Sequence, residues 1–296
     1  MVESKRPVDV FVDVLIHVVI VIACFLCLIP LLNTLALSFS SSVMASSGTV
    51  SFWPKQFTLA AYEAIVGEKQ FFGAFWISIK RVVLGGAINF LMMVLCAFPL
   101  AHSEKAFRGR NVYMYFLIFT MLFSGGLVPT YIIVGKMGLM NTLWALILPG
   151  AVPVWNCILL MNFFRSLPDE LEEAAIIDGA VPIQILVRIY LPVSLPSLAT
   201  VMLFCLVGHW NEFFSGLIYM NHSDNYPLAT YISTIVDSAK DLNLITDSEE
   251  IERIMKVSER NMSSAKIFVS MIPILIIYPF LQRYFVKGIV LGSVKG

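Results

Sequence analysis

The chain has 296 residues, of which 58% are hydrophobic and only 14% are charged, and its formal net charge is zero. Soluble domains average about 45–50% apolar and about 25% charged residues. This composition, with a mean hydropathy of +0.82, excludes intrinsic disorder and argues against a soluble enzyme. The 17 glycines and 5 cysteines exclude a collagen-like or disulfide-stapled fold. The balanced charge gives no indication of a nucleic-acid partner.

Several apolar stretches are long enough to cross a membrane. A transmembrane helix needs about 20 mostly apolar residues, whereas a transmembrane barrel shows shorter, alternating strands. We therefore expect an all-α polytopic membrane protein with six transmembrane helices in a single domain, residues 1–296. The first stretch follows Lys5 and Arg6, but it is too long for a signal peptide, so we expect it to be retained. The expected spans are residues 14–37, 82–101, 112–134, 143–164, 198–220 and 267–284.

The chain lacks the motifs of a catalytic or metal site. Gly135-Lys136 is followed by Met137 rather than by Ser or Thr, and no phosphate-binding loop precedes it. The histidines are scattered and all 5 cysteines lie inside apolar runs, including the pair Cys24 and Cys27. We expect no metal, no cofactor and no catalytic residue in this chain.

The polar loop over residues 165–197 contains the signals of a defined helix. Ser166 to Asp169 fits a capping box that would open it. The acidic residues that follow complement the helix dipole. Asp178 and Gly179 would end the helix, because glycine adopts the left-handed conformation at little cost.

The second half of the same loop predicts a second short helix. Pro182 suits its first turn, and Pro192 and Pro196 bound its end and the entry to the next span. We expect a helix–turn–helix elbow with a surface of small residues that another protein's backbone can approach closely. The small residues are Ala174, Ala175, Gly179 and Ala180.

This order of residues resembles the cytoplasmic coupling motif of the membrane subunits of bacterial ATP-binding-cassette importers, E-A-A-x-x-D-G-A followed by I-x-L-P. Leu186 stands where the family often has Phe, which keeps the apolar character. The D-G-A form resembles the carbohydrate importers of the maltose type, and the six-span chain resembles their smaller, second permease. The matching residues are Glu173, Ala174, Ala175, Asp178, Gly179, Ala180, Ile189, Leu191 and Pro192.

The resemblance extends to the fifth span and to the end of the chain. Trp210-Asn211-Glu212-Phe213 is similar to a W-N-x-F feature of the family. Tyr278-Pro279-Phe280 and the closing V-K-G are similar to the subgroup that serves alginate and aldouronate oligosaccharides.

The resemblance implies the fold of a type I importer permease and a set of partners. These are a second homologous permease, two ATPase subunits that bind ATP and magnesium, and an extracytoplasmic sugar-binding protein. It implies a bacterial inner-membrane protein with both termini and residues 165–197 in the cytoplasm, and residues 221–266 outside. Charge alone leaves the orientation weakly determined, because the 20 basic residues divide equally between the two sides. We expect Gly179→Asp to uncouple transport from ATP hydrolysis.

Glu212 is the ionisable residue whose role the sequence leaves open. It lies in the fifth span, and His209 is on the same helical face. Ionisable groups within membrane helices usually face a bundle interior or an aqueous cavity. Trp210, Asn211 and Glu212 are therefore candidates for the pathway lining, with helix packing as the alternative. A self-contained proton-coupled transporter using Glu212 and His209 is the rival function, although such a carrier needs no ATPase-docking elbow.

The outer loop and the tail give weaker signals. Asp247-Ser248-Glu249-Glu250 is typical of a solvated helix start rather than of a calcium loop. In the family, the outer loop reaches toward the binding protein and the tail of some members contacts the ATPase.

Overall fold

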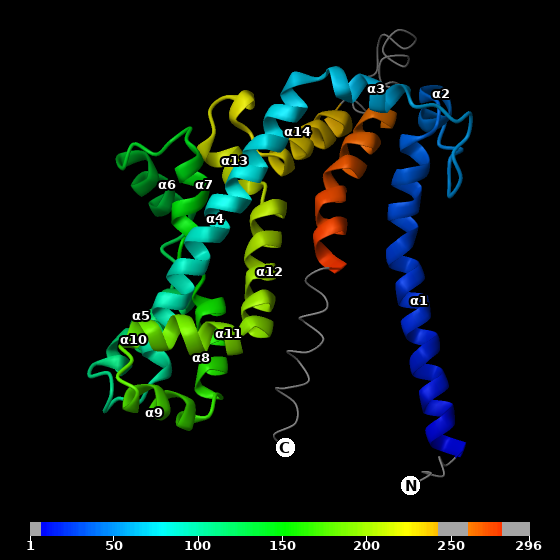
Figure 1. The fold of residues 1–296 in the computed structure, drawn as a ribbon. Helices are drawn as coiled ribbons and strands as arrows, with labels where there is room; N and C mark the ends of the chain where they lie inside the picture. The colour runs from blue at the N-terminus through cyan, green and yellow to red at the C-terminus, as the bar shows by residue number, and fades with distance from the viewer. Residues whose placement is uncertain (1–6, 242–259, 280–296) are drawn as a thin grey trace. The chain divides into compact units, whose positions relative to one another are not determined.

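The computed structural model describes residues 7–241 and 260–279, and its regular elements are all helices within these ranges (Figure 1). The expected helix start at 247–250, the tail and residues 280–284 of the last expected span lie outside the described residues. The helices are α1 Pro7–Ser38, α2 Ser42–Ser46, α3 Ala60–Gly67, α4 Lys69–Ala101, α5 Arg110–Leu122, α6 Leu127–Lys136, α7 Leu143–Ile147, η1 Leu148–Gly150, α8 Val154–Arg165, α9 Asp169–Ile177, α10 Pro182–Ile185, η2 Leu186–Tyr190, α11 Leu191–Val193, α12 Leu195–Asn211, α13 Phe214–Tyr219, η3 Ser223–Asn225 and α14 Leu228–Asp241, followed by the helix Arg260–Pro279.

Three of these helices are long and apolar enough to cross a membrane by themselves: Val10–Ser38, Lys69–Ala101 and Arg260–Pro279. Three further candidates are bent pairs, so the number of spans reaches six when each pair counts as one. The pairs are Arg110–Leu122 with Leu127–Lys136 at 111°, Leu143–Gly150 with Val154–Arg165 at 47°, and Pro182–Val193 with Leu195–Asn211 at 85°.

The bends have local causes that hydropathy does not register. Gly125 and Gly126 lie between α5 and α6, and Gly126 has a φ of +88°. Pro153 precedes α8 and offers no amide hydrogen to continue a helix. The expected fifth span is also interrupted, because α12 ends at Asn211 and α13 begins at Phe214.

The described residues form two compact units, one before residue 70 together with 234–241 and 260–271, and one over 70–233 together with 272–279. In the first unit, α1 is predominantly apolar, with a mean hydropathy of 3.0 in its most apolar window. Its C-terminal end packs through Ala36 and Leu37 on Ala45 and Val50. Lys266 forms an ion pair with Glu68 at 2.7 Å in the same unit.

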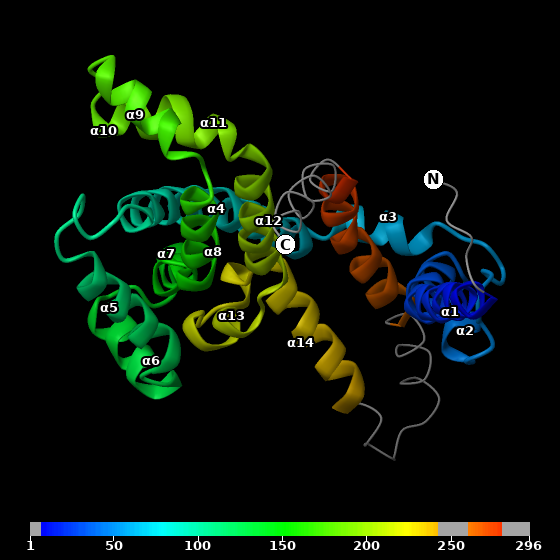
Figure 2. The same ribbon diagram turned by 90° about the horizontal axis from the view of Figure 1, so that it is seen from below.

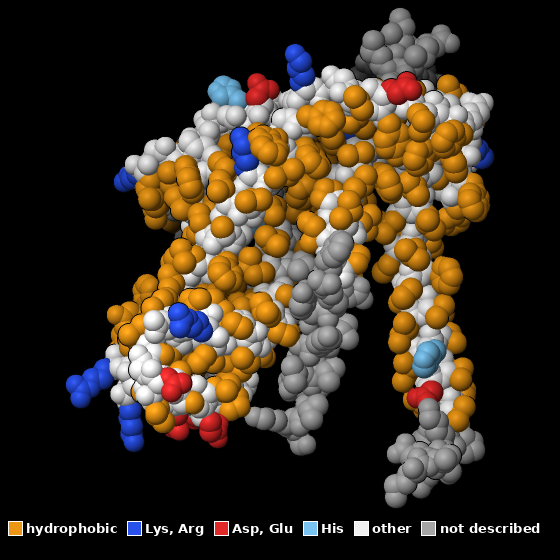
Figure 3. Space-filling view, in the orientation of Figure 1, with side chains coloured by type: hydrophobic (Ala, Val, Ile, Leu, Met, Phe, Trp, Pro, Cys, Tyr) orange, Lys and Arg blue, Asp and Glu red, His pale blue; other side chains and the backbone are white. Residues whose placement is uncertain are grey.

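Besides a smaller apolar cluster around Leu146 and Tyr219, the second unit has a large apolar core. It combines residues of α4, α8 and α12 with residues of the 165–197 loop, so that loop is packed onto the bundle. Figure 1 shows α9 and α10 at one end of this unit, with α7 and α13 toward the other end. In Figure 3, charged side chains gather toward these two ends, and apolar side chains cover the surface between them. This distribution fits a unit that crosses a membrane.

Candidate functional site

The first helix of the predicted elbow, α9, does not begin with the capping box that the sequence predicted at Ser166. Helix α9 begins at Asp169 after Pro168, and no side chain caps it. The Ser166 hydroxyl instead donates to the carbonyl of Phe163 at the end of α8, at 2.7 Å. The predicted capping box is therefore wrong. The start of α9 is instead stabilised by the acidic residues of its first turn, whose negative charges interact favourably with the positive end of the helix dipole.

The predicted end of α9 is confirmed in detail. Asp178 follows the last helical residue and Gly179 has a φ of +75°. The Ala180 amide donates to Ala175 at 2.9 Å, and the Gly179 amide donates to Ile176 at 3.0 Å. These two bonds are a Schellman motif, which requires the left-handed conformation that glycine adopts most easily.

The small residues of the motif divide between the core and the surface. Ala175 is buried in the core of the second unit, and Ala180 packs against that core. Ala174, Asp178 and Gly179 are exposed, as is Glu173. The small-residue surface is therefore narrower than predicted, since half of it holds the elbow onto the bundle.

An exposed apolar rim borders this surface and was not predicted. Ile177 is 85% exposed, and Ile176, Val181 and Ile183 are each at least 50% exposed. Isoleucine and valine side chains gathered on one exposed turn, beside acids, are typical of a protein interaction site. The elbow therefore presents an acidic helix start, a tight turn and an apolar rim to the outside.

The second arm of the elbow leads into α12 through a sharp bend. Pro182 occupies the first turn of α10, as predicted. The helix widens to a π-helix over Leu186–Tyr190. Pro192 follows and has no amide hydrogen, which leaves a carbonyl one turn earlier without its usual partner. Ile189 and Leu191 pack against the core, whereas Pro192 is exposed. Figure 2, seen from the elbow end, shows α9–α11 as an arm that extends away from α12.

The other end of the second unit contains a polar cavity of about 430 Å³. Its polar lining comes from α4, α8, the end of α12 and α13. The remaining wall is made mostly of small, proline and apolar residues of α7, η1 and α12. The polar residues are Arg81, Asn89, Asn156, His209, Glu212, Ser215 and Tyr219.

Arg81 is the buried cation of this cavity. Its guanidinium donates to the carboxylate of Glu212 at 2.6 Å and to the hydroxyl of Ser215 at 3.0 Å. It also donates to the backbone carbonyls of Glu212, at 2.9 Å, and of Leu146, at 3.3 Å. Glu212 further accepts the amide and the hydroxyl of Ser215. These are contacts of an ionised carboxylate, held where the α12–α13 break exposes backbone.

Asn89, two turns further along α4, also donates hydrogen bonds to backbone carbonyls at a bend. Its amide donates to the carbonyls of Gly150 and Ala151 at the α7–α8 bend, at 2.8 and 2.9 Å. Its oxygen lies 2.7 Å from Nε2 of His209. The contacts of His209 and Glu212 therefore go to different partners, which gives no support to a proton relay between them.

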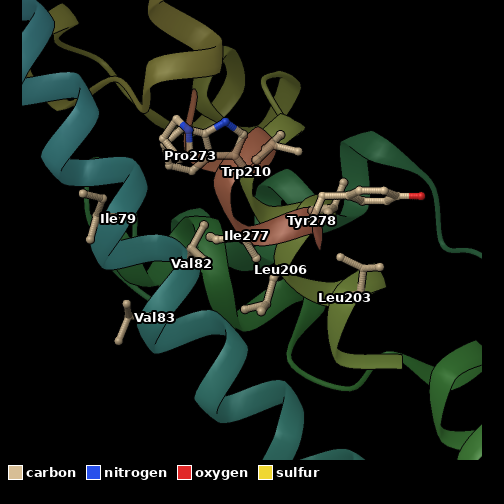
Figure 4. A pocket seen from close by; sticks show the side chains of 11 residues that line it. Ile79, Val82, Val83, Leu203, Leu206, Trp210, Pro273, Ile277 and Tyr278 are labelled. Carbon is tan, nitrogen blue, oxygen red and sulfur yellow. The ribbon is translucent and has the colours of Figure 1, made fainter. Parts of the chain in front are cut away.

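The three candidate pathway residues face different surroundings. Glu212 lines the polar cavity and Asn211 is exposed. Trp210 lines a separate, apolar pocket of about 260 Å³ between α4, α12 and the last helix. Figure 4 shows Trp210 in this pocket with Val82, Leu206 and Ile277. The polar cavity therefore brings Glu212 together with other polar side chains.

Sequence reasoning missed Arg81 because the second span was expected to begin at residue 82, and it also missed Asn89, which lies inside that expected span. Helix α4 instead begins at Lys69, which places Arg81 inside the helix. The signal was present as polar residues at helical spacing, namely Ser78, Arg81 and Asn89. The hydroxyl of Ser78, which also lies on α4, accepts the amide of Leu228 at the start of α14 at 2.7 Å.

Comparison with known proteins identifies relatives along nearly the whole chain. Residues 71–291 match the family model of the inner membrane component of binding-protein-dependent transport systems. Protein LplC of Bacillus subtilis (strain 168) is 40% identical, over 91% of this chain and 90% of the relative. The polygalacturonan/rhamnogalacturonan transport system permease protein YtcP of the same organism is 36% identical, over 96% and 98%.

A solved structure agrees with these relatives. It is that of a bacterial ABC transporter involved in the import of the acidic polysaccharide alginate, with a TM-score of 0.83 and 28% identity. It covers 95% of this chain and 98% of that chain. The expected all-helical importer permease fold is confirmed, and the chain is a transport subunit rather than an enzyme. The chain belongs to the family of inner membrane components of binding-protein-dependent transport systems.

Proposed function

We propose that this chain is one of two membrane subunits of an ATP-driven importer for oligosaccharides, including acidic ones. The observation that carries the proposal is the elbow, a helix with a Schellman turn and an exposed apolar rim packed onto the bundle core. The relatives that transport polygalacturonan or rhamnogalacturonan, and alginate, support an acidic oligosaccharide as the substrate class.

The elbow docks on a separate ATPase subunit in this proposal. Glu173, Ala174, Asp178 and Gly179 form its exposed surface. Ala175, Ala180, Ile189 and Leu191 hold the elbow to the bundle, and Pro192 marks the bend toward α12. Two ATPase subunits bind ATP and magnesium, and nucleotide-driven movement reaches the membrane helices through this surface.

The polar cavity forms this subunit's part of the substrate pathway. A cavity with a charged lining is stable within a membrane only when it faces water or another protein. Glu212 is its accessible charged group, with 37% of the side chain exposed. A second, homologous permease completes the pathway, and an extracytoplasmic binding protein delivers the sugar. Trp210 and Asn211 belong to the last turn of α12 and are not part of the wall of this cavity.

The proposed protein is a multi-pass protein of the bacterial inner membrane with both termini in the cytoplasm. This orientation places the elbow beside the cytoplasmic ATPase. The opposite end of the second unit, with the loop before α14, then faces the binding protein.

A reconstituted complex tests the proposal. The chain is co-expressed with the membrane and ATPase subunits that its neighbouring genes encode, and ATPase activity is measured in lipid nanodiscs. We expect binding protein loaded with an acidic oligosaccharide to stimulate ATP hydrolysis. A chain that purifies alone and moves solute along a proton gradient would overturn the proposal.

Two glycine variants make the test specific to the elbow. Gly179 and Gly109 have φ angles of +75° and +85°, and an added Cβ would meet no atom within 4 Å at either position. Asp at either site therefore carries a similar backbone strain of about 1–2 kcal/mol. We expect Gly179→Asp to abolish stimulated ATPase activity and Gly109→Asp to retain most of it. Equal losses in the two variants would mean that strain, not docking, is responsible.

A further inference from the structure

The histidine that follows α4, His102, makes one polar contact through each of its ring nitrogens. Nδ1 of His102 lies 2.8 Å from the carbonyl oxygen of Phe98, and Nε2 lies 2.9 Å from Oε1 of Glu172. A backbone carbonyl and an ionised carboxylate only accept hydrogen bonds. Both contacts are satisfied together only when both ring nitrogens carry a hydrogen. Both contacts therefore act as hydrogen bonds together only in the imidazolium form of His102.

The end of α4 favours a positive charge at this position. The last carbonyls of a helix lack partners within it and carry partial negative charge. The carbonyl of Leu100 accepts Arg110 Nε at 2.9 Å and Arg165 Nη2 at 3.0 Å. His102 thus lies at the same helix end as two arginines, and Glu172 is the carboxylate that contacts it from the elbow.

The contact between His102 and Glu172, called here the His102–Glu172 link, reaches both arms of the elbow through Glu172. Glu172 lies on α9, and its second oxygen accepts the hydroxyl of Tyr190 at 2.6 Å. Tyr190 ends the π-helix, and its ring stacks on that of His102 at a centroid distance of 6.2 Å. Burial, followed by the carboxylates of Glu172 and Asp169, raises the pKa of Tyr190. The phenol therefore keeps its proton and remains the donor.

Helix α4 connects this link to the polar cavity. It is a single helix of 33 residues, which spans about 50 Å at 1.5 Å per residue. Arg81 and Asn89 of the same helix hold the α12–α13 break and the α7–α8 bend. A displacement of α9 that is passed to α4 therefore reaches both interrupted spans.

We propose that His102 is a positioning residue for ATPase coupling, which as an imidazolium ties α9 to α4 through Glu172. This proposal rests on the proposed function, because it requires an elbow that an ATPase drives. Without the ion pair, the elbow passes less of its movement to α4, and ATP hydrolysis responds less to the binding protein.

The link makes coupling sensitive to pH. When His102 loses a proton, one ring nitrogen becomes an acceptor that faces another acceptor, so coupling falls as the pH rises. The charged and titratable groups around it are Glu172 and Asp169 on α9, Tyr190 on η2, Arg110 on α5 and Arg165 on α8.

The test measures the ratio of stimulated to basal ATPase activity in the reconstituted complex, from about pH 6 to about pH 9, across the range in which histidine changes charge. His102→Leu removes both hydrogen bonds, whereas His102→Gln keeps a neutral donor toward Glu172. We expect His102→Leu to lower the ratio roughly tenfold, the factor that a hydrogen bond to a charged group supports. His102→Gln should retain more of the ratio and lose the decline with pH that the wild type shows.

Glu170→Gln is the matched control for Glu172→Gln, because Glu170 is an exposed acid two positions earlier on α9. We expect Glu172→Gln to lower the ratio and Glu170→Gln to leave it within about twofold. The double variant His102→Leu/Glu172→Gln should be no worse than His102→Leu alone, since partners in one interaction are not additive.

Three results would each overturn the link: an unchanged ratio in His102→Leu, parallel pH profiles in the wild type and His102→Gln, or additive losses in the double variant. A wild-type complex without any stimulation is a separate outcome, which would overturn the proposed function itself.

Discussion

The guanidinium of Arg81 donates to acceptors of three residues, which are Leu146 on α7, Glu212 after α12 and Ser215 on α13. Only 4% of its side chain is exposed. A buried cation of this kind is stable only when its charge is compensated, and here both terminal nitrogens have acceptors whereas Nε has none. The residue therefore stabilises two backbone interruptions as well as one carboxylate.

Arg81→Met should destabilise the complex more than Glu212→Gln does. Removing one partner of a fully buried ion pair costs about 3–5 kcal/mol. The 37% exposure of Glu212 places this pair toward the lower end of that range. Arg81→Met also leaves two carbonyls without a donor, whereas Glu212→Gln keeps an oxygen that accepts from Arg81. Thermal unfolding of the detergent-solubilised complex measures the order, and a larger loss in Glu212→Gln would contradict this assignment.

At the scale of elements, interrupted membrane helices need donors from a neighbouring helix. Backbone carbonyls released at a bend have no water to bind inside a bilayer. Asn89 satisfies Gly150 and Ala151, and Arg81 satisfies Leu146 and Glu212. The polar face of α4 is thus explained by the breaks in the spans beside it.

Close packing of helices in this region gives a prediction for α13. A Cβ at Gly216 would lie 2.0 Å from Thr230 Oγ1 and 2.9 Å from Thr230 Cβ, on α14. Gly216→Ala should therefore destabilise the protein by about 1–3 kcal/mol through overpacking. Gly208→Ala on α12 is the control, because its Cβ would meet no atom within 4 Å, and alanine favours a helix by up to about 1 kcal/mol. Equal unfolding temperatures for the two variants would argue against the close α13–α14 contact.

At the scale of the whole molecule, the proposed orientation places the two ends of the second unit on opposite sides of the membrane. Ile177 lies at the elbow tip, 85% exposed, and Asp224 is exposed in the loop before α14. A cysteine at each position, in a variant without the native cysteines, can be labelled with a membrane-impermeant maleimide. We expect Asp224→Cys to react in intact spheroplasts and Ile177→Cys to react only in inverted vesicles. The reverse pattern would invert the topology.

The sequence by itself determined the membrane class, the α9 stop at Gly179 and the elbow, because apolar runs, prolines and glycines act locally. Composition could not reveal the bends, since an interrupted span has the same hydropathy as a straight one. It also could not pair Arg81 with Glu212, 131 positions apart, or His102 with Glu172, 70 positions apart. Those pairs exist only because folding brings α4 beside α12 and α9, where buried charges must find partners. The tertiary structure therefore decided which polar residues act together, and the local sequence decided where the elbow turns.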